Sequence, residues 1–80
     1  MRKLVGRNFE RLRRQQGLTQ EQVADRSGFS QQYISGLERG QRNPTVVTLY
    51  ELAQALGVSH VALVTPDDEE DFAGRDSLKS

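Results

Sequence analysis

The side chains that could do chemistry in this chain of 80 residues are amides, hydroxyls and guanidiniums. The chain has no cysteine and one histidine, His60, so it offers neither a thiolate metal site nor a cysteine nucleophile. The acids between Asp67 and Asp71 are contiguous and lack the spaced ligands and the glycine of a calcium loop. We therefore expect no metal, no cofactor and no enzymatic activity.

The charges are divided unevenly along the chain, although the formal net charge is zero. Residues 1–45 carry nine Lys/Arg and four Asp/Glu, whereas residues 46–80 carry two and seven, so the balances are +5 and −5. A basic segment followed by an acidic one favours contact with nucleic acid and an acidic tail. An ordinary solvated surface would give the same counts, so charge alone does not decide between the two.

Length and hydropathy favour one small domain. With 35% apolar residues, the chain can build one core but not two. No apolar run approaches the roughly 18 residues of a membrane span, and the N-terminus lacks the apolar core of a signal peptide. We expect a cytoplasmic protein with a folded domain at residues 1–65 and an acidic tail without fixed structure at residues 66–80.

The same local pattern recurs at four expected helix starts. A capping residue follows an apolar residue or proline and precedes another apolar residue by four positions. The capping residues are Thr19, Ser30, Thr45 and Ser59. Glycines suited to ending the preceding helices are Gly17, Gly28, Gly40 and Gly57. The sequence thus predicts an all-α domain of five helices at about residues 4–15, 20–27, 31–39, 46–56 and 60–64.

The second and third expected helices are joined by only Gly28, Phe29 and Ser30, which forces a sharp corner. Ala24 is small enough to let the two helices approach, and Gly28 provides the positive φ of the turn. The apolar residues that close the inside of this corner are Val23, Ile34 and Leu37. The pattern predicts a helix-turn-helix, whose second helix enters the major groove in DNA-binding proteins.

A helical wheel centred on buried Ile34 places a polar face on the other side of the helix at 31–39. Glutamine amides match the edge of adenine, arginine matches the edge of guanine, and serine matches several partners. We therefore predict DNA base contacts along this face. The residues are Gln31, Gln32, Ser35, Gly36 and Arg39.

The stretch "GLTQEQVADRSGFSQQYISGLERGQRNPTVVTLYELAQALGV" resembles the phage repressor and Cro-like, XRE-type helix-turn-helix domain, over about residues 4–64. The resemblance implies that Gln20 donates to a DNA phosphate, and that Arg42 and Asn43 approach the DNA backbone or the edge of the minor groove. It also implies a structural ion pair between Arg13 and Glu38.

Some residues on the expected DNA side have alternative explanations. The glycine at position 36 departs from family members with a longer polar residue there, so we expect fewer bases to be read directly and a greater dependence on DNA shape. We also predict backbone contacts for Arg14 and Tyr33, although Arg14 could be a solvated helix charge and Tyr33 could pack on the second helix.

A domain of this size buries too little DNA surface for tight specific binding, so we expect a homodimer on an inverted repeat. The predicted interface is Val58, Val61 and Val64, unless these residues only complete the monomer core. The predicted function is a sequence-specific transcription regulator of the repressor type that binds double-stranded DNA. The alternative is a protein-binding adaptor or antitoxin with the same fold, but the polar third helix lacks the apolar anchors of a protein-binding face. Any small-molecule or protein effector is not identified by the sequence.

Overall fold

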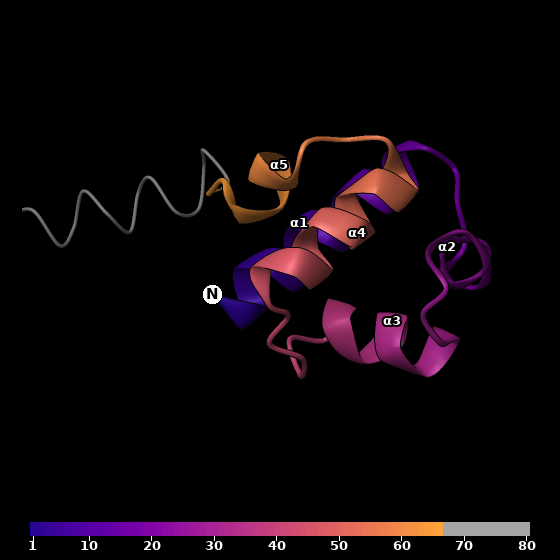
Figure 1. Cartoon of the computed structure of the whole chain (residues 1–80), viewed down its shortest axis with the longest axis horizontal. Coiled ribbons are helices and arrows are strands. Elements are labelled where there is room, and N and C mark those ends of the chain that lie inside the picture. Colours follow the sequence, from indigo (N-terminus) through magenta and orange to yellow (C-terminus); the bar gives the residue numbers. More distant parts are fainter. Residues whose placement is uncertain (67–80) are drawn as a thin grey trace, which may run out of the picture.

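A computed structural model describes residues 1–66 of the chain, so the predicted tail at 66–80 lies outside the described residues except for Pro66. Five helices and no strand form the described part, which confirms the predicted all-α class (Figure 1). Their bounds are α1 Arg2–Gln15, α2 Gln20–Ser27, α3 Gln31–Glu38, α4 Val46–Leu56 and α5 His60–Val64.

The helix boundaries follow the capping residues and glycines closely. Each predicted cap accepts a hydrogen bond from a backbone N–H of the first turn, and Thr19 and Gln22 form a reciprocal capping box. All four predicted glycines have φ between +69° and +82°. The main difference is at α1, which begins at Arg2 rather than near residue 4. Met1 provides no side-chain cap there, so the sequence carries no signal for this start.

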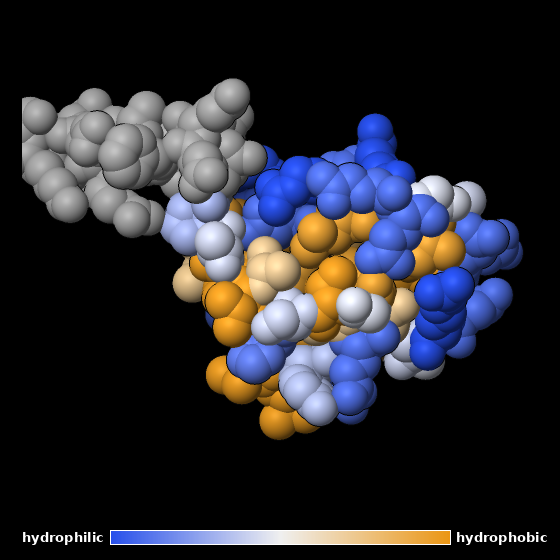
Figure 2. All heavy atoms as spheres, turned by 90° about the horizontal axis from the view of Figure 1, so that it is seen from above, coloured by the Kyte–Doolittle hydropathy of each residue, from blue (hydrophilic) through white to orange (hydrophobic). Residues whose placement is uncertain are grey.

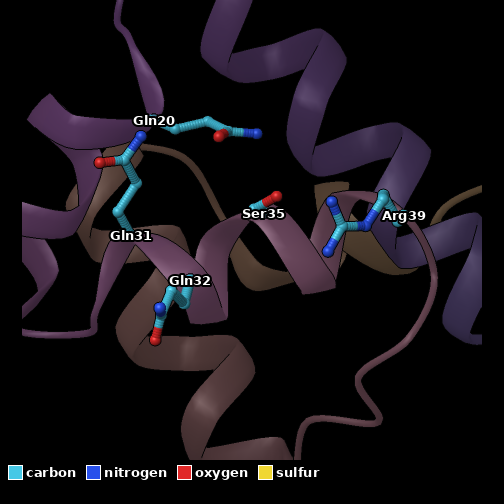
Figure 3. A pocket seen from close by; sticks show the side chains of 5 residues that line it. All are labelled: Gln20, Gln31, Gln32, Ser35 and Arg39. Atoms are coloured by element: carbon cyan, nitrogen blue, oxygen red, sulfur yellow. The ribbon is translucent and has the colours of Figure 1, made fainter.

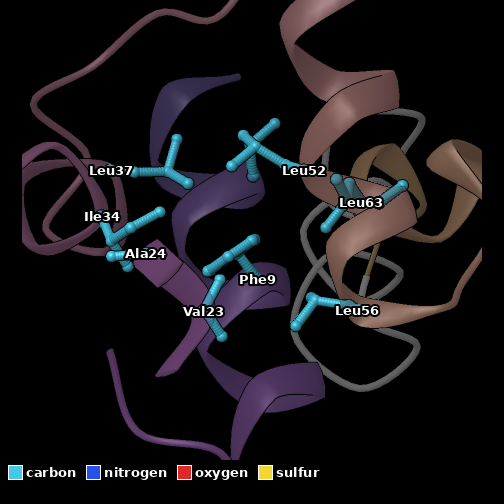
Figure 4. Packing of buried hydrophobic residues seen from close by; sticks show 10 residues of the cluster. Phe9, Val23, Ala24, Ile34, Leu37, Leu52, Leu56 and Leu63 are labelled. Atoms are coloured by element: carbon cyan, nitrogen blue, oxygen red, sulfur yellow. The ribbon is translucent and has the colours of Figure 1, made fainter. Parts of the chain in front are cut away.

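The core lies between α1 and the other helices. α1 packs against α3 and α5, α2 packs against α3 and α4, and α4 packs against α5. Phe9 of α1 is fully buried and lies among the apolar side chains of the other helices in Figure 4. Leu12 of α1 and Leu49 of α4 are partly buried and pack against this cluster.

Two residues of α1 make contacts that the sequence patterns do not reveal. Asn8 is fully buried, and its Nδ2 atom donates to the carbonyl oxygens of Leu63 and Thr65, both at 2.9 Å. Gly6 is also buried, and a Cβ atom there would lie 2.4 Å from the carbonyl oxygen of Leu37. Thus α1 is joined to the end of α5 by an amide and lies against the end of α3 through a glycine.

No helix in residues 1–66 is both long and apolar enough to cross a membrane.

Candidate nucleic-acid interface

The α2–α3 corner holds one face of α3 against the core. Gly28 ends α2 with φ +82°, and its N–H donates to the Ala24 carbonyl at 3.0 Å. Ile34 and Leu37 have no exposed surface, and Val23 of α2 is equally buried. Because these apolar side chains fix the rotation of α3, the opposite face of the helix turns to solvent.

The outward face of α3 carries most of the residues predicted to contact bases. Gln31, Gln32 and Arg39 are exposed, and Ser35 is half-buried. Together with Gln20 from the start of α2, they line a hollow of about 290 Å³ (Figure 3). The two glutamines extend from the first turn of α3, whereas the Arg39 guanidinium lies at the other end of the hollow, beyond Ser35. The face therefore offers amide, hydroxyl and guanidinium groups over the length of one short helix.

Gly36, the fifth residue predicted to contact bases, differs from these four because the loop after α3 covers it. The wheel treats α3 as an isolated helix, but in the structure Gly36 is buried. The Arg42 side chain covers it, since a Cβ atom on Gly36 would lie 3.1 Å from the Nε atom of Arg42. A residue of the following loop thus occupies the space that a side chain at position 36 would fill.

Tyr33 and Arg42 lie together on the flank of α3. The Cζ atom of Arg42 is 5.3 Å from the centroid of the Tyr33 ring, and that ring stacks on Phe29 with centroids 4.9 Å apart. Burial raises the pKa of the Tyr33 phenol, and the positive charge of Arg42 partly opposes this shift. Tyr33 is therefore in contact with two protein groups, while Arg42 and its neighbour Asn43 remain exposed in the loop.

Arg13 and Glu38 form a bidentate ion pair between α1 and α3. The Nε and Nη2 atoms of Arg13 donate to the two carboxylate oxygens at 2.6 and 3.0 Å, and a further Arg13 nitrogen donates to the Leu18 carbonyl. The hydrogen bond to Glu38 raises the pKa of Arg13, against the opposing effect of burial. Gln20 also donates to Glu38, at 3.0 Å. One amide proton of Gln20 is thus used within the protein, and the predicted phosphate contact depends on the other.

The sequence of this corner matches a known family. The helix-turn-helix model HTH_3 matches residues 9–63, which is most of the chain and includes α2 and α3. The chain belongs to the HTH_3 helix-turn-helix family. This confirms the resemblance drawn from the sequence.

Relatives and solved structures of HTH_3 type agree with this assignment. The uncharacterized HTH-type transcriptional regulator y4dJ of Sinorhizobium fredii is 77% identical over 75 residues, covering 94% of this chain and 97% of the relative. The control protein C.SmaI of Serratia marcescens is 38% identical over 65 residues, covering 81% of this chain and 77% of the relative.

Among solved structures, the restriction–modification controller C.AhdI of Aeromonas hydrophila is similar with a TM-score of 0.73 and 39% identity, covering 76% of this chain and 92% of that one. The controller C.Esp1396I was solved as a tetramer in complex with its natural 35 base-pair operator. It has a TM-score of 0.72 and 35% identity, covering 78% of this chain and 82% of that one.

Arg14, the remaining predicted backbone contact of this HTH_3 domain, lies on α1. Its guanidinium is 2.8 Å from the Glu10 carboxylate one turn earlier, and its side chain is 70% exposed. Exposed pairs of this kind contribute little to stability, so the arginine is available to other anions.

The apolar surface of the HTH_3 domain is larger than the three valines predicted as the dimer interface. Val61 is 54% exposed, whereas Val58 and Val64 are half-buried and pack against the core. Val46, Val47 and Tyr50 of α4 are also exposed, and the Tyr50 ring makes an edge contact with His60 at the start of α5. Figure 2, which looks down on the α4–α5 side, shows apolar surface beside a hydrophilic margin. The two valines lie in the first turn of α4, ahead of its buried residues Leu52, Ala53 and Leu56, and the sequence analysis did not assign them to the interface.

Proposed function

We propose that this protein is a sequence-specific DNA-binding transcription regulator of the repressor type, and that α3 enters the major groove. The observation that carries the proposal is the division of α3 into two faces. Ile34 and Leu37 are fully buried, while Gln31 and Gln32 are exposed at the start of the same helix. Two adjacent amides held outward by a rigid corner have the chemistry needed to pair with base edges.

The polar groups of this surface divide into two roles. Gln31, Gln32, Ser35 and Arg39 lie on the helix and are assigned to base edges. Asn43 in the loop, Arg14 on α1 and the free amide proton of Gln20 are assigned to the phosphates, which fix the position of the protein on the duplex.

The protein acts as a homodimer in this proposal, with two copies of α3 reading half-sites about one helical turn, or ~34 Å, apart. The interface is assigned to the α4–α5 side, where Val61 and Tyr50 are more than half exposed. We define this as the α4–α5 face, comprising Val46, Val47, Tyr50 and Val61. The operator complex of the similar controller C.Esp1396I contains a tetramer, which supports assembly of more than one copy on DNA.

A protein-binding adaptor or antitoxin with the same fold is a less well supported function. Protein-binding hot spots are enriched in buried aromatic and arginine anchors that fill pockets on the partner. The hollow on α3 is lined by three glutamines, a serine and an arginine, with no apolar side chain. This lining favours hydrogen bonding to base edges over docking of an apolar partner surface.

The test is selection of bound duplexes from a random pool, followed by binding titrations with two variants. Gln32→Ala is expected to relax the preference at one or two base positions by ~1–3 kcal/mol, whereas Asn43→Ala weakens binding to all duplexes alike. Circular dichroism of both variants checks that the fold is retained. Failure to enrich any sequence, or the same effect from both variants, would contradict the proposal.

A further inference from the structure

Gly36 stands in the middle of α3, where a glycine costs about 1 kcal/mol of stability relative to alanine. Its lack of a side chain leaves room for Arg42. A Cβ atom at position 36 would lie 3.1 Å from Nε of Arg42, 3.5 Å from Cγ and 3.8 Å from Cδ. The aliphatic part of the arginine side chain therefore rests on the bare surface of the helix at Gly36.

The backbone at the end of α3 brings Arg42 back to this place. Gly40 has φ +76°, and its N–H donates to the Leu37 carbonyl at 3.0 Å. The next N–H, of Gln41, donates to the carbonyl of Gly36 at 2.9 Å. These two bonds form a Schellman motif, which ends the helix and reverses the chain. The carbonyl of Gly36 thus anchors Gln41, and the residue after it, Arg42, lies across the Cα atom of Gly36.

The guanidinium end of Arg42 has its own support. Its Cζ atom lies 5.3 Å from the centroid of the Tyr33 ring, within the range of a cation–π interaction. Tyr33 is three residues before Gly36, so both lie on the same flank of α3. The stack of Tyr33 on Phe29 limits movement of the ring. The arginine is thus held at two points along its length.

We propose that Gly36 and Tyr33 are positioning residues for Arg42, which together hold its guanidinium at the edge of the DNA-facing surface of α3. Arg42 then supplies, from the loop, the long polar group that position 36 lacks. This inference rests on the proposed function. The group that Arg42 meets is a hydrogen-bond acceptor of the duplex, either a phosphate oxygen or the O6/N7 edge of a guanine.

A double-mutant cycle on the duplex recovered from a random pool tests whether Gly36 acts through Arg42. Arg42→Ala should bind about 10-fold more weakly, as expected for one lost arginine contact. Gly36→Ala should lose part of this factor, because its methyl group displaces the Arg42 side chain, although its thermal midpoint is at least that of the wild type. Adding Gly36→Ala to Arg42→Ala should cost nothing further. The inference is overturned if Gly36→Ala weakens binding equally with and without Arg42→Ala. It is also overturned if Gly36→Ala alone binds with wild-type affinity.

The salt dependence of binding identifies the acceptor. If Arg42 meets a phosphate, Arg42→Ala lowers the slope of log K against log salt by about one. If it meets a guanine, the slope is kept and the preference at one base position is lost. Either result is expected of a positioned guanidinium. An unchanged slope together with an unchanged preference overturns the inference.

A measurement on the free protein separates this inference from the proposed function. The ring of Tyr33 should shift the NMR resonances of the Arg42 side chain from their values in an exposed arginine. Both Gly36→Ala and Tyr33→Leu should return these resonances towards the exposed values. If both variants do so, and the protein enriches no duplex from the random pool, the positioning stands and the DNA-binding function fails. If Gly36→Ala leaves the Arg42 resonances unchanged, the positioning is wrong, whatever the DNA result.

Discussion

Replacing Glu38 with alanine should destabilise the fold strongly. The Glu38 side chain is 4% exposed and accepts hydrogen bonds from two nitrogens of Arg13 and from Gln20. Removing one partner of a buried ion pair leaves the other charge uncompensated, at a cost of about 3–5 kcal/mol. Arg13 keeps its hydrogen bond to the Leu18 carbonyl at 2.7 Å, so we expect the lower end, about 3 kcal/mol. For a domain of this size, that lowers the thermal midpoint by roughly 12–24 °C.

Urea unfolding followed by helical circular dichroism measures this loss as a lower midpoint at an unchanged slope. Glu10→Ala is the matched control, because it breaks the pair with Arg14, whose side chain is 70% exposed. That change should cost less than about 0.5 kcal/mol. Glu38→Gln should fall between the two, since it removes the charge but keeps one acceptor oxygen. If Glu38→Ala is no more damaging than Glu10→Ala, the pair does not hold α3 against α1 and the reasoning is refuted.

Three further predictions concern other parts of the domain. Gly6→Ala should lower stability despite the higher helix propensity of alanine, by about 1–3 kcal/mol in urea unfolding, because the new methyl group meets a backbone carbonyl; an increase in stability would contradict the close packing. In a Tyr50→Phe background, phenolate absorbance should show Tyr33 titrating above the ordinary pKa of about 10, because burial raises its pKa. The raised pKa contributes stability that is present below pH ~10 and lost as the pH rises through the folded-state value, so a stability independent of pH in this window would count against it. Val61→Lys should shift sedimentation equilibrium towards monomer and abolish tight binding to an inverted repeat, whereas Gln15→Lys, with the same added charge at the end of α1, should leave both unchanged.

The helices and their order could be predicted from the sequence because their signals are local. A cap such as Thr19 and a glycine such as Gly28 act within one turn of the helix they bound, so their types and spacing are enough. The outward direction of Gln31 and Gln32 was predictable for a similar reason. Once Ile34 is buried, the geometry of the helix determines which residues face away from it.

The parts that could not be predicted depend on contacts between residues far apart in the chain, or on the path of one side chain. Asn8 binds carbonyls 55 and 57 residues away, and no periodicity records such a bond. Gly6 is buried only because the end of α3 approaches it. A helical wheel also cannot show that Arg42 returns over Gly36, since it describes a helix without its neighbours. The exposure of Val46 and Val47 likewise depends on where the other helices lie.

The placement of Arg42 has a consequence for exchanging DNA preferences between relatives. A transplant of α3 alone would carry Tyr33 and Gly36 into the host but would leave behind the arginine that rests on them. In the host protein, the helix surface at Gly36 would lack the Arg42 side chain that covers it here, and the loop of the host would cover it differently. The smallest exchangeable unit therefore runs from Phe29, on which Tyr33 stacks, through Arg42, with the loop included.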